Sequence, residues 1–286
     1  MILPKITIVT VVFNRVATIE QTISSVVNQT YPNLEYIVID GGSNDGTVEL
    51  IKKYEKSIAW WVSEKDGGIY DAMNKGVRAS TGDYIEFIGS DDCLCSYDIV
   101  AKVAEKMDDE TDIISFPVYV VDEGYCTERI FDNSFAVDKK TYHGGMIPHP
   151  GMFTRRELLQ KYPFDIKYKM VSDYKFFLLC YYDDTVKFKF VDFPVVYFSH
   201  DGISSRTDTT QEKLWMYSEL GLVFPKEEST ILEKCKNFLR EMLIYVHIYT
   251  FLHEKIFLPI RHSFMKTHYC NNEICRWCGG KGKHKK

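Results

Sequence analysis

The chain has 286 residues, 45% of them apolar and 26% charged, so it is long enough to bury a substantial core as one large domain or as a domain with an appendage. Residues 1–8 lack the long apolar core of a signal peptide, and no run of about 18 apolar residues occurs. We therefore expect neither a signal peptide nor a membrane-spanning helix. The eight cysteines show no pairing framework, which favours free thiols in a reducing compartment.

The net charge of −5 is distributed unevenly along the chain. Residues 253–286 carry a net charge of +6, which leaves −11 for residues 1–252. A basic tail on an acidic body suits contact with an anionic surface such as a membrane. A solvated tail without a partner explains the same charge equally well, so both interpretations stay open.

Residues 5–89 alternate between strand patterns and helix patterns. Apolar residues at helical spacing predict helices over residues 19–27, 47–54 and 69–79. Between them, runs of β-branched and other apolar residues predict strands at Lys5–Phe13, Leu34–Asp40, Ile58–Ser63 and Asp83–Gly89. This alternation is typical of βαβ units and a parallel sheet.

Polar residues follow the ends of these strands, namely Asn14, Asp40, Asp66 and the adjacent pair Asp91 and Asp92. Crossover connections carry the carboxyl ends of parallel strands to the same edge of a sheet. We therefore expect one edge to be acidic and rich in glycine. Open α/β sheets bind their ligands at that edge.

The second half of the chain is less regular. Its patterns predict helices and strands in turn, with helices at residues 97–107, 155–161, 171–182 and 211–220, and strands at 112–121, 127–131 and within 186–199. The loop over residues 142–151 is rich in Gly, His and Pro. Ser172 is expected to be the N-cap of its helix, with Asp173 in the first turn.

The character of the chain changes near residue 230. A predicted helix begins there with apolar residues on one face, and toward residue 257 nearly all of its residues are apolar or aromatic. Pro259 ends or kinks this helix. Such a helix, followed by basic residues, suits a membrane interface. Packing against the rest of the chain or against a second subunit is the alternative. The cysteines at 270, 275 and 278 do not form the two clean pairs of a metal knuckle, so we favour unligated thiols.

The pair Asp91 and Asp92 points to a metal site. Mg²⁺ and Mn²⁺ prefer oxygen ligands and commonly bridge carboxylates to substrate phosphates, where they neutralise the charge of a diphosphate leaving group. Adjacent aspartates in a loop are more often solvated turn formers, but the other polar residues expected at this edge favour the site. The dinucleotide and P-loop glycine motifs are absent, so those two classes lack support.

Four segments, over residues 9–14, 23–47, 63–76 and 81–92, together resemble family 2 glycosyltransferases of the GT-A fold. They include Val-Thr-Val-Val-Phe-Asn, Val-Ile-Asp-Gly-Gly-Ser-Asn-Asp-Gly-Thr, Asp-Gly-Gly-Ile-Tyr-Asp-Ala-Met-Asn-Lys-Gly and Phe-Ile-Gly-Ser-Asp-Asp. The likeness is strong up to Asp92 and thinner up to about Ser204. It implies an α/β fold with a Rossmann-like mixed sheet flanked by helices, followed here by a C-terminal helical extension.

The resemblance also implies roles for single residues. Asp91 would meet the ribose and Asp92 would hold Mn²⁺ or Mg²⁺, in a variant of the family's DxD element that has Ser90 in place of a first Asp. His200 could reach the metal or the diphosphate, although a lone His is more often structural. The other residues implied to bind the nucleotide sugar are Thr10 and Asn14 at the nucleotide, Asp40 at its base, and Asp66 and Asn74 beside the nucleotide or diphosphate.

Two segments of the second half carry further implied roles. Residues 149–153 resemble the segment that faces the donor sugar and the acceptor, which places His149 there. Residues 169–174 resemble the segment with the catalytic base, and Asp173 is the sole candidate because Ser172 stands where many members have Glu. Asp173 would take a proton from the acceptor hydroxyl, giving inversion in one displacement. Without the resemblance, an acidic residue that stabilises a helix N-terminus would be the better interpretation.

We therefore expect a metal-dependent, inverting glycosyltransferase of surface polysaccharide synthesis. Its partners would be a nucleotide-diphosphate sugar, UDP-sugar first among them, and a glycan or polyprenyl-linked acceptor, with no nucleic acid. The expected regions are a GT-A domain over 1–225, an amphipathic helical region over 226–268 and a basic tail over 269–286. We expect a cytoplasmic location at the inner face of the plasma membrane, and a homo-oligomer is compatible with it. The alternatives are a sugar nucleotidyltransferase and a catalytically silent nucleotide- or glycan-binding module.

Overall fold

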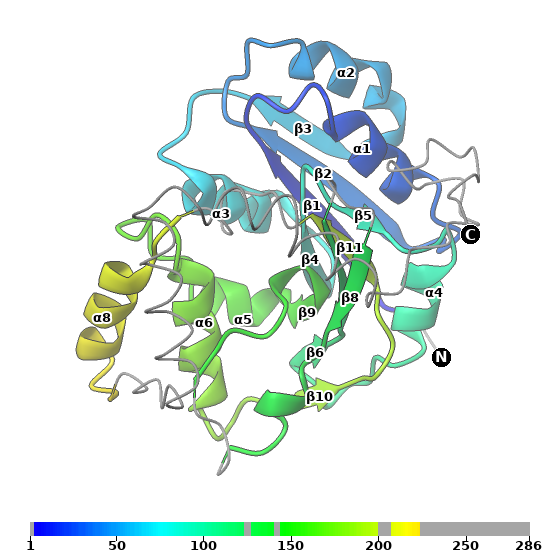
Figure 1. The fold of residues 1–286 in the computed structure, drawn as a ribbon. Helices are drawn as coiled ribbons and strands as arrows, with labels where there is room; N and C mark the ends of the chain where they lie inside the picture. The colour runs from blue at the N-terminus through cyan, green and yellow to red at the C-terminus, as the bar shows by residue number, and fades with distance from the viewer. Residues whose placement is uncertain (1–2, 123–126, 140–143, 200–206, 224–286) are drawn as a thin grey trace, which may run out of the picture.

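The computed structural model describes residues 3–122, 127–139, 144–199 and 207–223 (Figure 1). The expected helical region over 226–268 and the tail over 269–286 lie outside these residues, as does His200. Within the described part of the chain, no helix has both the length and the apolar character that a membrane crossing requires.

A mixed sheet of seven strands forms the centre of the described residues, in the order β10-β6-β9-β4-β1-β2-β3. The consecutive strands β4, β1, β2 and β3 are parallel, whereas β9 runs antiparallel between β4 and β6. The strand bounds are β1 Ile6–Val12, β2 Leu34–Asp40, β3 Trp60–Ser63, β4 Tyr84–Gly89, β6 Ile113–Ser115, β9 Met152–Arg155 and β10 Phe188–Phe190.

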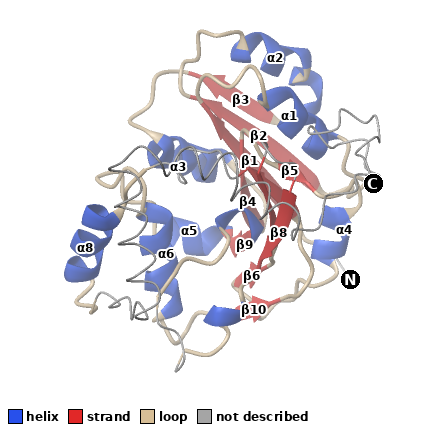
Figure 2. Cartoon of the chain, in the orientation of Figure 1, coloured by secondary structure: helices blue, strands red, loops and turns tan. Residues whose placement is uncertain are grey.

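Helices cover both faces of this sheet (Figures 1 and 2). Helices α1, α2 and α4 pack on one face against Ile8 and Val38, while α3, α5 and α6 pack on the other against Val9 and Ile39, with α8 outside α6. Because the strands are buried on both faces, they are apolar runs rather than alternating patterns. The helix bounds are α1 Ile19–Val27, α2 Thr47–Lys53, α3 Ile69–Ala79, α4 Ile99–Ala104, α5 Arg156–Lys161, α6 Ser172–Tyr181 and α8 Thr210–Glu219.

A second, four-stranded sheet stands beside the end of β4, in the order β5-β11-β7-β8. Its strands are β5 Cys93–Leu94, β7 Val118–Asp122, β8 Thr127–Phe131 and β11 Val196–Ser199. Ser90, Asp91 and Asp92 are the only residues between β4 of the first sheet and β5 of the second. The aspartate pair therefore lies where the chain passes from one sheet to the other.

The predicted elements of the first half are confirmed, and the second half differs in three places. The strand predicted over 112–121 is two strands, one in each sheet, separated by Phe116 and by Pro117, which has no N–H for a sheet. Strand β9 was not predicted. Ser172 is not an N-cap, because Val171 holds that position and the Ser172 hydroxyl accepts a hydrogen bond from the Asp165 N–H at 2.5 Å.

Candidate active site

The carboxyl ends of β1, β2, β3 and β4 meet at one edge of the main sheet. In the register of the parallel strands, Asp40 is level with Val12 on one side and with Ser63 on the other, and Val11 is level with Gly89. The polar residues after these strands therefore come to the same edge, as the sequence predicts. This edge is where parallel α/β sheets bind ligands.

Asp40 organises the loop that follows β2. Its carboxylate is fully buried, and Oδ2 accepts hydrogen bonds from the N–H of Gly42 at 3.1 Å, the N–H of Ser43 at 2.9 Å and the hydroxyl of Ser63 at 2.6 Å. The Ser43 hydroxyl donates to Oδ1 at 2.5 Å. The carboxylate thus fixes the loop to the end of β3, while binding of a nucleotide base by Asp40 stays a prediction.

Asn14 holds the end of β1 to the same loop. It has a left-handed backbone, with φ of 51°, a conformation that Asn tolerates better than most residues. Its N–H donates to the Ser43 hydroxyl at 2.7 Å, and its side-chain oxygen accepts from the Asn44 N–H at 3.0 Å. Phe13, next to it, is 60% exposed at this edge. Asn14 is therefore placed at the predicted site, with its oxygen engaged in shaping the loop.

Asp66 lies against Gly41 at the same edge. A Cβ atom added to Gly41 would come within 2.7 Å of the Asp66 Oδ2 atom, so only glycine leaves room for this carboxylate. The other carboxylate oxygen, Oδ1, accepts a hydrogen bond from the Gly68 N–H at 2.9 Å. Gly68 has a φ of 118°, which favours glycine, and directly precedes α3. Asp66 therefore joins the loop after β2 to the start of α3.

Asp92 is almost fully buried between the two sheets. Its Oδ1 accepts a hydrogen bond from the Ser199 N–H at 2.8 Å and its Oδ2 accepts one from the Gly89 N–H at 3.2 Å. A Cβ atom on Gly89 would lie 2.5 Å from the Asp92 Oδ2 and 3.1 Å from the Asp91 Oδ1. Gly89 thus leaves space for both carboxylates. His200, a predicted metal ligand, follows Ser199 directly in the chain and lies outside the described residues.

The donor set at this point fits Mn²⁺ or Mg²⁺. Two carboxylates share the space that Gly89 leaves free, and such ions are commonly held by one or two carboxylates together with substrate phosphates. Among the described residues, no group of three or more His, Cys, Asp or Glu side chains is arranged to hold a metal by itself. Further ligands would therefore have to come from the phosphates or from residues that the structure does not describe.

Asp173 stands at the start of α6, next to Tyr70 of α3. The Tyr70 hydroxyl donates a hydrogen bond to the Asp173 Oδ1 at 2.8 Å, and the Tyr174 N–H donates to the same oxygen at 2.9 Å. The side chain of Asp173 is partly exposed, whereas Tyr70 is 5% exposed. Asp173 thus lies in the first turn of a helix, and its role as catalytic base stays a prediction.

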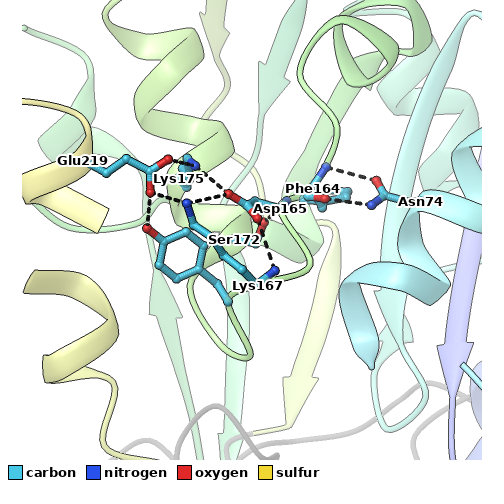
Figure 3. Close-up of polar contacts among 8 residues, drawn as sticks. Asn74, Phe164, Asp165, Lys167, Ser172, Lys175 and Glu219 are labelled. Atoms are coloured by element: carbon cyan, nitrogen blue, oxygen red, sulfur yellow. Dashed lines mark hydrogen bonds and ion pairs between the residues drawn. The ribbon is translucent and has the colours of Figure 1, made fainter. Parts of the chain in front are cut away.

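The hydrogen bonds of the Asn74 side chain go to the backbone of Phe164. Its side-chain NH₂ donates to the Phe164 carbonyl at 2.7 Å, and its side-chain oxygen accepts from the Phe164 N–H at 3.0 Å (Figure 3). Both polar atoms of the amide are thus engaged with the backbone of one residue. The predicted role of Asn74 beside the diphosphate stays a prediction, and the contact that the structure shows is a clasp on the segment before α6.

The segment that leads into α6 is also tied to α8. The Lys175 ammonium contacts the Asp165 Oδ2 and the Glu219 Oε1, each at 2.7 Å (Figure 3). The Glu212 carboxylate accepts hydrogen bonds from the N–H groups of Lys169 and Met170, each at 2.9 Å. Helices α3 and α8 therefore hold the residues before Asp173 from two sides.

His149 belongs to an aromatic cluster beside Asp173. Its ring is stacked on Phe87 at 5.7 Å between centroids and meets the edge of Phe164 at 6.0 Å. Burial among these rings lowers the pKa of His149 below its ordinary value, although the Asp173 charge acts in the opposite direction. The predicted place of His149, facing the donor sugar and the acceptor, stays a prediction.

Thr10 is the one predicted site residue of β1 that the structure places inside the fold. It is fully buried in the middle of the strand, and its hydroxyl forms a hydrogen bond of 3.0 Å with the Tyr36 hydroxyl. Contact of its side chain with a nucleotide stays a prediction without support from this geometry. The partly exposed Val11 and the exposed Phe13 lie nearer the edge.

Comparison with known proteins assigns the family. The family model described as Glycosyl transferase family 2 matches residues 7–163, more than half of the chain. The chain belongs to glycosyl transferase family 2. The strands and polar residues at the sheet edge lie within the matched range, whereas Asp173 lies beyond it.

Relatives and solved structures agree with this family and with the GT-A fold. A PGL/p-HBAD biosynthesis glycosyltransferase of Mycobacterium bovis is 26% identical over 77% of this chain and 87% of its own length. S. aureus TarS 1–349, solved with UDP-GlcNAc, matches with a TM-score of 0.59 and 18% identity over 71% of this chain and 61% of that one. Glucosyl-3-phosphoglycerate synthase from Mycobacterium tuberculosis, solved with Mn²⁺, UDP and phosphoglyceric acid, matches with a TM-score of 0.55 and 18% identity over 77% and 80%.

Sequence reasoning missed Tyr70 and Phe164. Tyr70 lies inside one of the segments that carry the family resemblance, four residues before Asn74, so both occupy one face of α3. That spacing was the available signal. Phe164 had no signal in the sequence, because its importance comes from the clasp by Asn74, 90 residues away.

Proposed function

We propose that this glycosyltransferase family member transfers a sugar from a UDP-sugar to a hydroxyl group of a glycan or lipid-linked acceptor, with inversion at the anomeric carbon. The observation that carries the proposal is the division of its carboxylates. Asp91 and Asp92 stand at the end of β4, whereas Asp173 stands on α6 with one oxygen held by Tyr70. Donor activation and proton removal from an acceptor need two such separate groups.

The donor class is supported by the edge of the main sheet and by the fold neighbours. The loop fixed by Asp40 and Asn14, together with Asp66, surrounds the end of the parallel strands where nucleotides bind in open α/β folds. Two proteins of similar fold were solved with UDP-GlcNAc or with UDP. A UDP-sugar is therefore the donor that we test first.

A divalent metal is part of the proposal. Asp92, with Asp91 beside it, would hold the ion against the donor diphosphate, and it would supply positive charge that stabilises the leaving group. One fold neighbour was solved with Mn²⁺. The buried position of Asp92, fixed by the Ser199 and Gly89 amides, keeps its carboxylate in one orientation.

Asp173 would act as the general base. The acceptor oxygen attacks the anomeric carbon from the side opposite the diphosphate and forms the new glycosidic bond with its lone pair. The carbon–oxygen bond to the diphosphate breaks, and its electron pair leaves with UDP. The acceptor proton goes to a carboxylate oxygen of Asp173, so that attack on one face yields inversion.

The test is a donor screen with purified full-length protein, several UDP-, GDP- and dTDP-sugars and Mn²⁺, in which released nucleoside diphosphate is measured. With the active donor, Asp173→Asn is expected to lower turnover at least a hundredfold while UDP binding is retained, because general bases contribute about 10²–10⁴-fold. Asp92→Ala is expected to weaken metal-dependent UDP binding as well. The matched control is Asp184→Asn, since this carboxylate is 97% exposed.

Four outcomes would contradict parts of the proposal. Full activity of Asp92→Ala would refute the metal assignment, and an unaffected Asp173→Asn would refute the base. Release of pyrophosphate from a nucleoside triphosphate would indicate the nucleotidyltransferase instead. Nucleotide binding without transfer under every condition would indicate a silent binding module. Membrane contact, the cytoplasmic location and a homo-oligomer remain predictions from the sequence.

A further inference from the structure

We infer that Tyr70 is a positioning residue that orients the Asp173 carboxylate for proton transfer. The inference rests on the proposed function, since Asp173 must be the base of a transfer reaction. It gives a role to a residue of α3 to which the sequence resemblance assigns none. The contact that carries it is the hydrogen bond of 2.8 Å from the Tyr70 hydroxyl to the Asp173 Oδ1.

The two oxygens of Asp173 have different surroundings. Oδ1 accepts two hydrogen bonds, one from the Tyr70 hydroxyl and one of 2.9 Å from the Tyr174 N–H. Oδ2 has no hydrogen-bond donor among the described residues. The carboxylate is thus held by one oxygen, and the other is the oxygen that can receive the acceptor proton. A side chain held by a helix amide alone would keep more rotational freedom.

The Tyr70 hydroxyl is itself held in place by packing. The Tyr70 ring is 5% exposed and is stacked on Phe164 at 5.8 Å between centroids, with an angle of 28° between the ring planes. Asn74, one turn along the same helix, clasps the backbone of Phe164 through two hydrogen bonds. The Tyr70 hydroxyl is therefore already in position beside Asp173, and the two side chains need little reordering when substrate binds.

Tyr70 can only be the donor of this hydrogen bond. Burial, followed by the charge of Asp173, raises the pKa of Tyr70 well above its ordinary value, so the hydroxyl stays protonated over the working range of pH. The charge of Asp173 also acts on His149, whose pKa is lowered by burial. The neutral hydroxyl stabilises the ionised carboxylate by hydrogen bonding without competing with it for the acceptor proton.

The helix that carries Tyr70 also connects the two halves of the proposed site. Helix α3 begins directly after the loop in which Asp66 lies against Gly41 and Gly68. Tyr70 follows Gly68 by two residues in the sequence, yet its hydroxyl contacts Asp173, which is 103 positions later. The start of α3 therefore contacts both the candidate base, Asp173, and the loop residue Asp66 at the proposed donor side.

The test compares Tyr70→Phe with the wild type in the sugar-transfer assay. We expect kcat to fall roughly 10- to 100-fold, since hydrogen bonds to charged groups contribute about 1.5–3 kcal/mol. The KM for the donor and the affinity for UDP should stay unchanged. In the Asp173→Asn background, Tyr70→Phe should cause no further loss.

The matched control is Tyr181→Phe, which removes a buried tyrosine hydroxyl whose bond goes to the Ala136 carbonyl at 2.8 Å. It should leave kcat near the wild-type value. An unchanged kcat in Tyr70→Phe, or additive losses with Asp173→Asn, overturns the inference while the proposed function stands. Absence of transfer by the wild type overturns both.

Discussion

Glu86 provides the sharpest test of the buried chemistry near the site. It lies in the middle of β4, level with Ile8 of β1, and is fully buried in the core beneath α1 and α4. Neither of its carboxylate oxygens has a hydrogen-bond partner in the part of the chain that the structure describes. Burial, and to a smaller extent the charge of Asp92, raises the pKa of Glu86 well above its ordinary value. Glu86 therefore keeps its proton to higher pH in the folded protein than in the unfolded chain.

The perturbation is Glu86→Gln, which keeps the shape and the neutral polar group but cannot ionise. In the unfolded chain Glu86 loses its proton near pH 4.5, whereas in the folded protein it holds the proton to higher pH. A raised folded-state pKa contributes stability that is fully present below the unfolded-state pKa and is lost as pH rises toward the folded-state pKa. Each pH unit in that window changes the free energy of unfolding by roughly 1.4 kcal/mol per proton.

The assay is urea unfolding of wild type and Glu86→Gln at several values of pH from about 4 to 7. At the low end the two proteins should have similar free energies of unfolding. Above the unfolded-state pKa the variant should become progressively more stable than the wild type, by roughly 1.4 kcal/mol for each pH unit up to the folded-state pKa. Taking the difference between the two proteins removes the contributions of all other groups. A difference that stays constant with pH would refute a protonated Glu86.

Two further substitutions test how the site is built. Gly41→Ala should lower UDP affinity roughly tenfold, because its Cβ atom would lie 2.7 Å from the Asp66 Oδ2 and displace that carboxylate. Gly67→Ala is the matched control in calorimetry, since its Cβ atom would meet Asp71 only at 3.6 Å, and equal affinities of the two variants would contradict this account. Asn74→Ala should destabilise the fold by about 1–3 kcal/mol in urea unfolding, because the N–H and carbonyl of Phe164 lose their partner. Asn28→Ala, whose amide bonds only to Ser24 on the surface, should change stability far less, and a similar loss in both would argue against the clasp.

Local pattern was sufficient for the first half of the fold. The bounds of β2 and α3 match the predicted ranges, and the polar residues after β1 to β4 come to one edge. Parallel strands that alternate with helices leave few arrangements, because crossovers share one hand and carry strand ends to the same side. For this reason Asp40, Asp66 and the pair Asp91 and Asp92 could be grouped from the sequence.

The second half could not be assembled in this way. Strand β9 inserts antiparallel between β4 and β6, and β11 pairs with β5 and β7, although these strands are far apart in sequence. Short strands of this kind have little periodicity of their own, and their pairing depends on which edges the rest of the sheet leaves uncovered. The burial of Asp92 between Gly89 and Ser199 follows from that pairing, so the sequence did not reveal it.

The amino-acid sequence by itself determined the family, the parallel half of the sheet and the edge that carries the aspartates. These depend on local periodicity and on short motifs, which are readable without distances. The tertiary structure decided which polar side chains are engaged in hydrogen bonds within the protein. It showed that both polar atoms of the Asn74 amide hold Phe164, that Thr10 is buried against Tyr36, and that Tyr70 meets Asp173. Those contacts join residues that are 26 to 103 positions apart, and only packing of the whole chain brings them within hydrogen-bonding distance.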